Sequence, residues 1–119
     1  MEQKLEFSYN WNNKLNNLAF STLRLRNDNR YFKGARFQVY LKGTFKGTAK
    51  VEAVNHFTID KITEFVARID TGYSASECRK IIREMHKNNP RIDWKTQQLA
   101  FSLLVYEEKK EMNDLFADR

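Results

Sequence analysis

The sequence predicts a small α+β domain in which a curled, mostly antiparallel sheet is closed by two helices. Two observations predict this class: segments with alternating apolar and polar residues fill the first half and return near the end, and two stretches of helical period lie between them. With 119 residues and neither a repeat nor a linker, the chain has the length of one domain. We expect a small β-barrel of about five or six strands, with two main helices and a short N-terminal helix.

Four strands and the short helix are predicted in the first half of the chain. Apolar and polar residues alternate in residues 4–10, 18–26, 36–42 and 48–57. The asparagine-rich segment 11–18 spaces its apolar residues at near-helical intervals, which predicts the short helix. Gly43 and Gly47 predict the turn between the third and fourth strands.

The strand at residues 18–26 carries a row of polar side chains on one face. Because side chains alternate between the two faces of a strand, Leu23 and Leu25 suit a core, and the other face receives Thr22, Arg24 and Arg26. The row is either a solvated strand face or a functional surface. Two arginines spaced two residues apart suit phosphate or base-edge contacts, since each guanidinium offers a planar fork of donors.

Two amphipathic helices are predicted in the second half. The first has Asp60 as a candidate N-cap, ends at Gly72, and has an apolar stripe of Ile62, Phe65, Val66 and Ile69. Ser74 and Glu77 form a capping box that starts the second helix. The apolar stripe of this second helix is Cys78, Ile81, Ile82 and Met85.

Residues 99–106 are apolar on both faces, which predicts a strand at the centre of the sheet or beneath a helix. We place a single domain at residues 1–107. Residues 108–119 are interpreted as a charged C-terminal tail, in which Leu115 and Phe116 are candidates for docking.

Positive charge is concentrated in the first half of the chain. The formal net charge is +6; residues 1–57 contain ten Lys and Arg against four Asp and Glu, whereas residues 58–119 contain eleven of each sign. A basic surface attracts polyanions by steering and counterion release, although many small basic domains have no such partner. No apolar run approaches the roughly 20 residues of a membrane-spanning helix, and the N-terminus lacks the core of a signal peptide. We therefore expect a cytoplasmic protein without a membrane partner.

Several segments together resemble an ASCH domain, the compact branch of the PUA-like superfamily. The resemblance covers roughly residues 18–107 and runs through "STLRLR", "YFKGARFQVYLKG", "GTAKVEAV", "ITEFVARIDTGYS", "SECRKIIREMH" and "LAFSLLVYE". It implies a β-barrel with helices at one end and a cleft beside the strand of Thr22 and Arg24. ASCH domains are proposed RNA-binding modules, PUA relatives bind structured RNA or modified nucleotides, and a few ASCH members hydrolyse N4-acetylcytidine or RNA.

The pattern of the hydrolase members is matched only in part. The resemblance aligns their threonine, arginine and glutamate with Thr22, Arg24 and Glu77, but their lysine falls on Ala19. A hydroxyl is a poor nucleophile until a base takes its proton, and alanine cannot do so. Lys14 lies eight residues before Thr22, and no pattern in the sequence brings it to that strand. The absent lysine favours binding over catalysis, and the capping box alone accounts for Glu77.

The leading hypothesis is therefore a nucleic-acid-binding module without a cofactor, with RNA favoured over DNA. Its site is a basic cleft beside residues 22–26, formed by Arg24, Arg26, Arg30, Lys33, Arg36 and Lys42, with Trp11 and Tyr40 as candidates for stacking on bases. One alternative is a small hydrolase of N4-acylcytidine-type nucleosides or RNA that uses Thr22 and Glu77. Another is a protein-interaction module.

The remaining chemistry-bearing residues are assigned to the core or to the surface. His56 and His86 lie far apart and lack the acidic or thiol neighbours of a metal site, so no metal is expected. Cys78 is the single cysteine, which excludes an intrachain disulfide and suits a core position. The aromatic residues expected to pack are Phe37, Phe65, Trp94 and Phe101.

Overall fold

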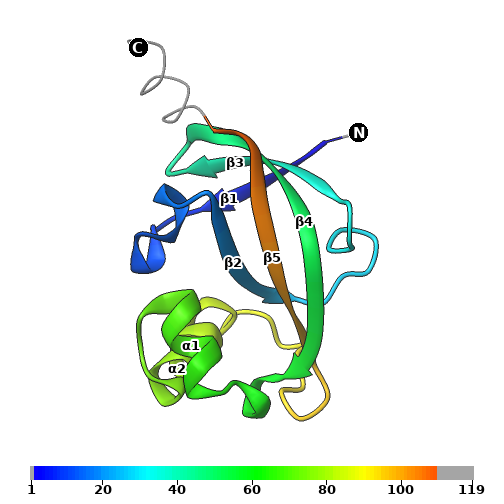
Figure 1. Ribbon diagram of the computed structural model, residues 1–119. Helices are drawn as coiled ribbons and strands as arrows, with labels where there is room; N and C mark the ends of the chain where they lie inside the picture. Colours follow the sequence, from blue (N-terminus) through cyan, green and yellow to red (C-terminus); the bar gives the residue numbers. More distant parts are fainter. Residues whose placement is uncertain (1, 110–119) are drawn as a thin grey trace.

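A five-stranded sheet curls into an open half-barrel, and two helices lie at one end of it (Figure 1). The architecture is that of a computed structural model, which describes residues 2–109. Its α+β class and the number of strands agree with the prediction. The predicted barrel is a half-barrel, because the strand order is β1-β3-β4-β5-β2 and the two edge strands do not pair with each other.

The strands are β1 (Gln3–Phe7), β2 (Ala19–Leu25), β3 (Arg36–Leu41), β4 (Thr44–Thr58) and β5 (Gln98–Lys109). β1 pairs with β3 in parallel, and the other three pairings are antiparallel. β5 lies between β4 and β2, which confirms its predicted central position. It also includes residues 108 and 109, so the sheet extends into the predicted tail. The rest of that tail, with Leu115 and Phe116, lies outside the described residues.

The turn between β3 and β4 is tighter than predicted. Lys42 and Gly43 make the whole connection, with φ angles of 51° and 81°. A two-residue hairpin of this kind requires positive φ at both central positions, and glycine adopts it without strain. The predicted second half of the turn is strand instead, and the β3–β4 register shifts opposite residues 45–47.

The helical segments are η1 (Trp11–Asn16), η2 (Ile59–Lys61), α1 (Glu64–Thr71) and α2 (Ala75–Met85). The N-cap of α1 is Thr63, whose hydroxyl accepts from Val66 N at 3.1 Å, rather than the predicted Asp60, which lies in η2. α2 begins as predicted, since the hydroxyl of Ser74 accepts from Glu77 N at 3.1 Å. Over residues 2–109, no helix has the length and apolarity needed to cross a membrane.

Helix α1 buries only part of the predicted apolar stripe: Ile62 and Val66 pack in the cluster between sheet and helices, and the other two residues do not. Phe65 is 75% exposed and Ile69 is 45% exposed, whereas Ala67, Asp70 and Thr71 are buried. The prediction that Phe65 packs in the core is therefore wrong. The predicted stripe counts helical spacing from Ile62, but Ile62 lies in extended backbone before the helix begins. The helical spacing of the residues after it therefore does not by itself place them on the same side as Ile62. The buried face instead carries Asp70 toward the N-terminal segment.

Hydrophobic clusters occupy both sides of strand β2. The first fills the half-barrel and contains Phe20 and Phe37; the second lies between sheet and helices, where Leu23 and Leu25 pack. Since Thr22 shares the face of Phe20, it points into the half-barrel and is only 2% exposed. The polar row on β2 is therefore not a simple solvated strand face.

Candidate functional site

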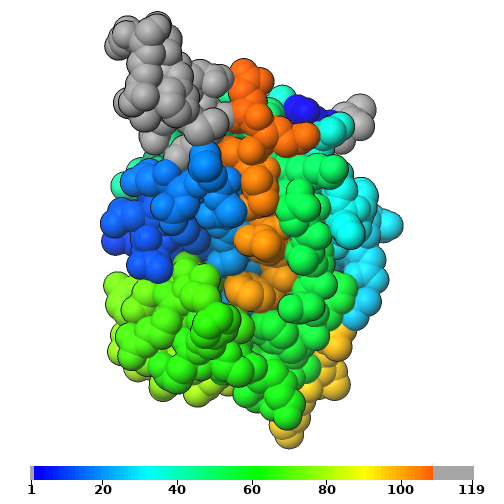
Figure 2. Space-filling view, in the orientation of Figure 1, coloured from blue at the N-terminus to red at the C-terminus, as the bar shows by residue number. Residues whose placement is uncertain are grey.

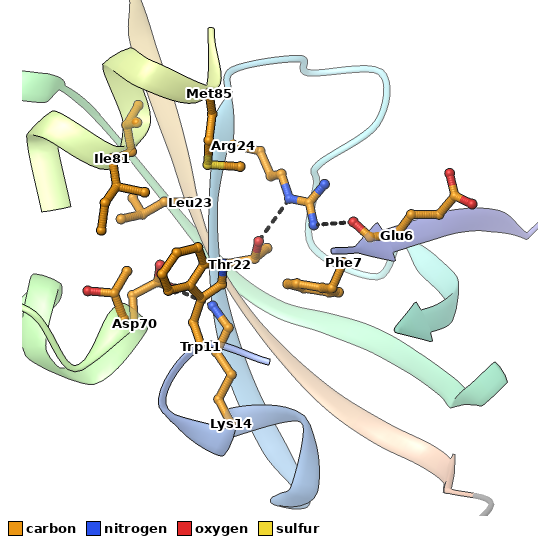
Figure 3. Close-up of a pocket in the computed structure, with 12 residues that line it drawn as sticks. Glu6, Phe7, Trp11, Lys14, Thr22, Leu23, Arg24, Asp70, Ile81 and Met85 are labelled. Carbon is orange, nitrogen blue, oxygen red and sulfur yellow. Dashed lines mark hydrogen bonds and ion pairs between the residues drawn. The ribbon is translucent and has the colours of Figure 1, made fainter. Parts of the chain in front are cut away.

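A pocket lined by both charged and apolar side chains lies at the seam of the half-barrel, where side chains from the edge strands β1 and β2 approach each other (Figure 3). In Figure 2 the surface of the η1–β2 segment, in blue, meets the helical end, in green. The pocket, called the seam pocket below, has a volume of about 70 Å³. Its lining residues are Glu6, Phe7, Trp11, Lys14, Thr22, Leu23, Arg24, Asp70, Thr71, Ile81, Ile82 and Met85.

A buried ion pair forms one part of the seam pocket. Lys14 Nζ lies 2.9 Å from Asp70 Oδ1, and the two side chains are 5% and 6% exposed. Ser21 Oγ donates to the same carboxylate oxygen at 2.8 Å. A buried charge is tolerated only with such partners, because its solvation is lost. Burial lowers the pKa of Lys14, although the carboxylate of Asp70 acts in the opposite direction, and the charge of Arg24 lowers that pKa further.

The Arg24 guanidinium links the two edge strands. Its Nε donates to Thr22 Oγ1 at 3.0 Å, and its Nη2 donates to the carbonyl oxygen of Glu6 at 2.9 Å. The guanidinium carbon lies 4.7 Å from the centroid of the Phe7 ring, and Lys14 Nζ lies 5.5 Å from the same centroid. Burial lowers the pKa of Arg24, but a guanidinium stays charged at any physiological pH. Two cations and the buried carboxylate of Asp70 thus face a small pocket, and the carboxylate of Glu6 points away from it (Figure 3).

A second arginine covers the open edge of β1 outside the pocket. Arg30 Nη2 donates to the carbonyl oxygen of Lys4, and its guanidinium carbon lies 5.4 Å from the Tyr31 ring and 5.3 Å from the Phe37 ring. An uncovered strand edge invites pairing with another chain, and side chains that occupy its carbonyl groups prevent this. Arg30 therefore has a structural role, whereas Arg24 serves both the strand edge and the pocket.

Trp11 brings an aromatic cluster to the mouth of the seam pocket. Its ring centroid lies 4.7 Å from that of Tyr9 and 6.1 Å from that of Tyr73, and both tyrosines are exposed. A shallow hollow of about 430 Å³ adjoins the pocket, since Trp11, Ile81 and Met85 line both. We call it the apolar hollow; Lys80 and Glu84 complete its lining.

Arg26 and Lys33, two other predicted site residues, lie in a separate hollow of about 440 Å³ formed with β4. Arg26 Nε and Nη2 donate to the two carboxylate oxygens of Asp28, at 2.8 and 3.0 Å. The hydrogen bond to Asp28 raises the pKa of Arg26 and lowers that of Asp28. Arg26 therefore faces a carboxylate rather than the seam pocket.

The predicted site residues on β3 and in the turn after it line neither the seam pocket nor the hollow that contains Arg26 and Lys33. Arg36 Nε donates to Glu107 Oε1 at 2.8 Å, and this contact raises the pKa of Arg36. Tyr40 contacts the Lys4 ammonium, 5.3 Å from its ring centroid. Lys42 occupies the β3–β4 hairpin turn. The predicted basic residues are thus dispersed, and only Arg24 and Trp11 of the predicted binding set line the seam pocket.

The residues of the hydrolase pattern are separated in a similar way. Thr22 and Arg24 line the seam pocket, but Glu77 is exposed on α2 and does not. Ala19 is exposed at the start of β2. The seam pocket instead contains Lys14 and Asp70, which sequence reasoning did not assign to it.

Lys14 and Asp70 carry no local pattern that marks them. The only signal is the asparagine-rich segment around Lys14, since Asn12 and Asn13 both have positive φ, at 56° and 52°. Asparagine tolerates this conformation better than most residues, and it gives η1 its tight shape. Asn12 Nδ2 also donates to the carbonyl oxygens of Arg68 and Ile69, at 3.2 and 3.3 Å, which joins η1 to the end of α1.

No group of three or more His, Cys, Asp or Glu side chains is arranged to hold a metal ion within residues 2–109. Cys78 is buried in the cluster between sheet and helices. Burial raises the pKa of the Cys78 thiol to about 11, which leaves it protonated and unsuited to nucleophilic work.

Fold and site together define a small α+β half-barrel domain with a donor-rich pocket at its open seam. Neither a protein-family model nor a curated protein sequence matches this chain. Its fold is similar to the crystal structure of protein EF3133 from Enterococcus faecalis V583, of the family DUF984. The two chains share 9% sequence identity over 92% of this chain and 83% of that one, with a TM-score of 0.64. At this identity the likeness shows the fold alone.

Proposed function

We propose that this chain is a nucleic-acid-binding module that binds RNA through the seam pocket beside residues 22–26. The observation that carries the proposal is the composition of the pocket: Lys14 and Arg24 meet one buried carboxylate, that of Asp70, whereas the carboxylate of Glu6 is exposed and points away from the pocket (Figure 3), so the charge inside the pocket is positive. An exposed aromatic cluster around Trp11 lies at the mouth. Cationic donors beside aromatic rings suit the phosphates and the bases of an unpaired strand.

The dispersed basic residues support the same proposal as contacts to the phosphate backbone. Arg26 and Arg36 hold carboxylates, but both pairs lie at the surface. Exposed ion pairs contribute only about 0–1 kcal/mol, so a phosphate can replace such a carboxylate at little cost. Lys33 and Lys42 are exposed and add positive charge along the first half of the chain.

The assignment to the ASCH branch of the PUA-like superfamily is part of this proposal. It is supported by the order of the elements and by the Thr22 and Arg24 pair, which borders a pocket at the end of the sheet that the helices cover. The resemblance to PUA-like domains implies RNA ligands, which agrees with the net positive charge of the chain.

A salt titration tests RNA binding. We expect binding to single-stranded and structured RNA at low salt, with a log-log slope of roughly -0.7 to -0.9 for each neutralised phosphate. The variant Arg24→Gln should weaken binding, whereas Lys95→Gln, a change of the same kind in the exposed loop before β5, should leave it unaltered. An absence of binding at low salt, or a flat salt dependence, contradicts the proposal.

A hydrolase is the second candidate, and one observation favours it. Lys14 lines the same pocket as Thr22, so an amine lies near the threonine even though Ala19 replaces the lysine of the pattern, and burial lowers the pKa of that amine. In this reaction Thr22 Oγ attacks the acyl carbon of an N4-acylcytidine while Lys14, as the neutral amine, takes the hydroxyl proton and returns it to the departing amine of cytidine. Water then hydrolyses the ester and regenerates the threonine hydroxyl.

Incubation with N4-acetylcytidine tests this candidate. Release of cytidine and acetate by the wild type, lost in Thr22→Ala and retained in Thr48→Ala, would support it. Circular dichroism of each variant establishes that the fold is intact. Turnover that survives Thr22→Ala excludes Thr22 as the nucleophile, and no release by the folded wild type rejects hydrolysis of this substrate.

A further inference from the structure

The hydrogen-bonding groups of the seam pocket are mainly donors. Thr22 Oγ1 accepts from Arg24 Nε, and its own proton has no acceptor among residues 2–109. Arg24 uses Nε and Nη2, and its Nη1 has no partner in that range. Asp70 Oδ1 already receives Lys14 and Ser21, which leaves Oδ2 as the acceptor of this buried carboxylate, fewer than the unpaired donors around it. A group that enters the pocket should therefore present acceptors.

The size of the pocket limits what can enter it. Its volume of about 70 Å³ is smaller than the roughly 150 Å³ of a protein cavity that holds one benzene ring. An aromatic ring therefore cannot be enclosed, and only its edge can reach Thr22 and Arg24. The adjoining apolar hollow, at about 430 Å³, is large enough for the ring itself.

The walls of the apolar hollow suit a flat ring. Trp11 and Met85 line both the hollow and the seam pocket, and Met85 is 63% exposed. Aromatic rings and thioethers provide polarisable contacts for the face of a base. A ring that lies against Trp11 is therefore next to the seam pocket, and one of its edges can reach the donors there.

We propose that the seam pocket and the apolar hollow together bind one unpaired base that carries a keto edge, with its carbonyl oxygen at Thr22 and Arg24 and its ring against Trp11. This inference rests on the proposed RNA binding and adds a base preference to it. Adjacent acceptors such as O6 and N7 of a 6-keto purine match a fork of donors, whereas adenine presents an amino donor at that position. Adenine should therefore bind less well.

Two matched RNA strands test the preference. One is a short oligoadenylate, and the other is the same strand with a single central inosine, so the phosphates are identical and only one base edge differs. At roughly 50 mM salt we expect the inosine strand to bind on the order of tenfold more tightly, as measured by fluorescence anisotropy. If neither strand binds, RNA binding and this inference both fail. If the two bind equally, or adenine is preferred, RNA binding stands and the inference is overturned.

Two variants connect the preference to the pocket. Thr22→Val keeps the shape of the buried side chain and removes its donor, so the ratio of the two affinities should fall toward one. Thr48→Val, the same change on β4 outside the pocket, should leave that ratio unaltered. A ratio that persists in folded Thr22→Val overturns the assigned contact. In a Trp94→Phe background, the fluorescence of Trp11 should change on binding of the inosine strand; an unchanged signal removes Trp11 from the site.

Discussion

Lys14 and Asp70 are 56 residues apart in the sequence, yet their side chains form a buried ion pair of 2.9 Å. The pair joins η1 to α1 at the wall of the seam pocket. Neither charge reaches solvent to any large extent, so each depends on the other for its solvation. Because the same two side chains line the seam pocket, loss of the pair should both destabilise the domain and change the shape of the pocket.

Removal of Lys14 should destabilise the domain strongly. Lys14→Met leaves the Asp70 carboxylate buried without its counterion, which costs about 3–5 kcal/mol in comparable cases. Urea unfolding followed by circular dichroism measures the loss. The double variant Lys14→Met with Asp70→Asn removes both charges and keeps an acceptor for Ser21, so it should recover most of the stability. A Lys14→Met variant as stable as the wild type contradicts the buried pair.

Stability should also depend on pH through Lys14. Burial holds the pKa of Lys14 in the folded protein below the ordinary value of 10.5, which applies in the unfolded chain. At a pH between the lowered pKa and 10.5, the unfolded chain therefore binds more protons than the folded one. A rise in pH through this window therefore stabilises the fold. The free energy of unfolding of the wild type, relative to the Lys14→Met and Asp70→Asn double variant, should increase as pH approaches 10.5. A difference that stays constant or falls is inconsistent with the lowered pKa.

The fold was predictable where local patterns act alone. Alternation located the strands, and the capping box located the start of α2, because both depend on residues within a few positions of each other. The face of α1 was not predictable. Phe65 and Ile69 complete an apolar stripe, but Ala67 and Asp70 face the interior because η1 contacts that side.

The candidate site was predictable along β2 and at Trp11, which the sequence also marks and which lines the seam pocket. The sequence pattern marks Thr22 and Arg24, and both line the seam pocket. Lys14, Asp70 and Phe7 reach the pocket through tertiary contacts that no spacing encodes. The position of Arg36 has the same cause, since its partner Glu107 lies 71 residues away in the sequence, whereas Arg26 meets Asp28 only two residues along the chain.

Arg30 and Arg26, two arginines outside the seam pocket, should differ in their effect on stability. Arg30 contacts Tyr31 and Phe37 and donates to the carbonyl oxygen of Lys4, so Arg30→Ala should cost about 1–3 kcal/mol and accelerate hydrogen exchange in β1. Arg26→Ala removes an exposed ion pair and should change stability by about 1 kcal/mol or less. Chemical denaturation and exchange measurements check both. Equal effects would contradict the role of Arg30 at the β1 edge.

The thiol of Cys78 should be inert in the folded protein. Cys78 is buried, and burial raises its pKa to about 11, so the reactive thiolate is scarce near neutral pH. Modification by a disulfide reagent at about pH 8 should be more than about a hundredfold slower in the native protein than in the urea-unfolded chain, where an ordinary pKa near 8.5 applies. The variant Cys78→Ser, which has no thiol, gives the background signal of the assay. Cys78 lies on α2 and packs against the sheet. Rapid native modification would therefore mean that the helical end opens away from the sheet, and that Ile81 and Ile82, which line the seam pocket from the same helix, move with it.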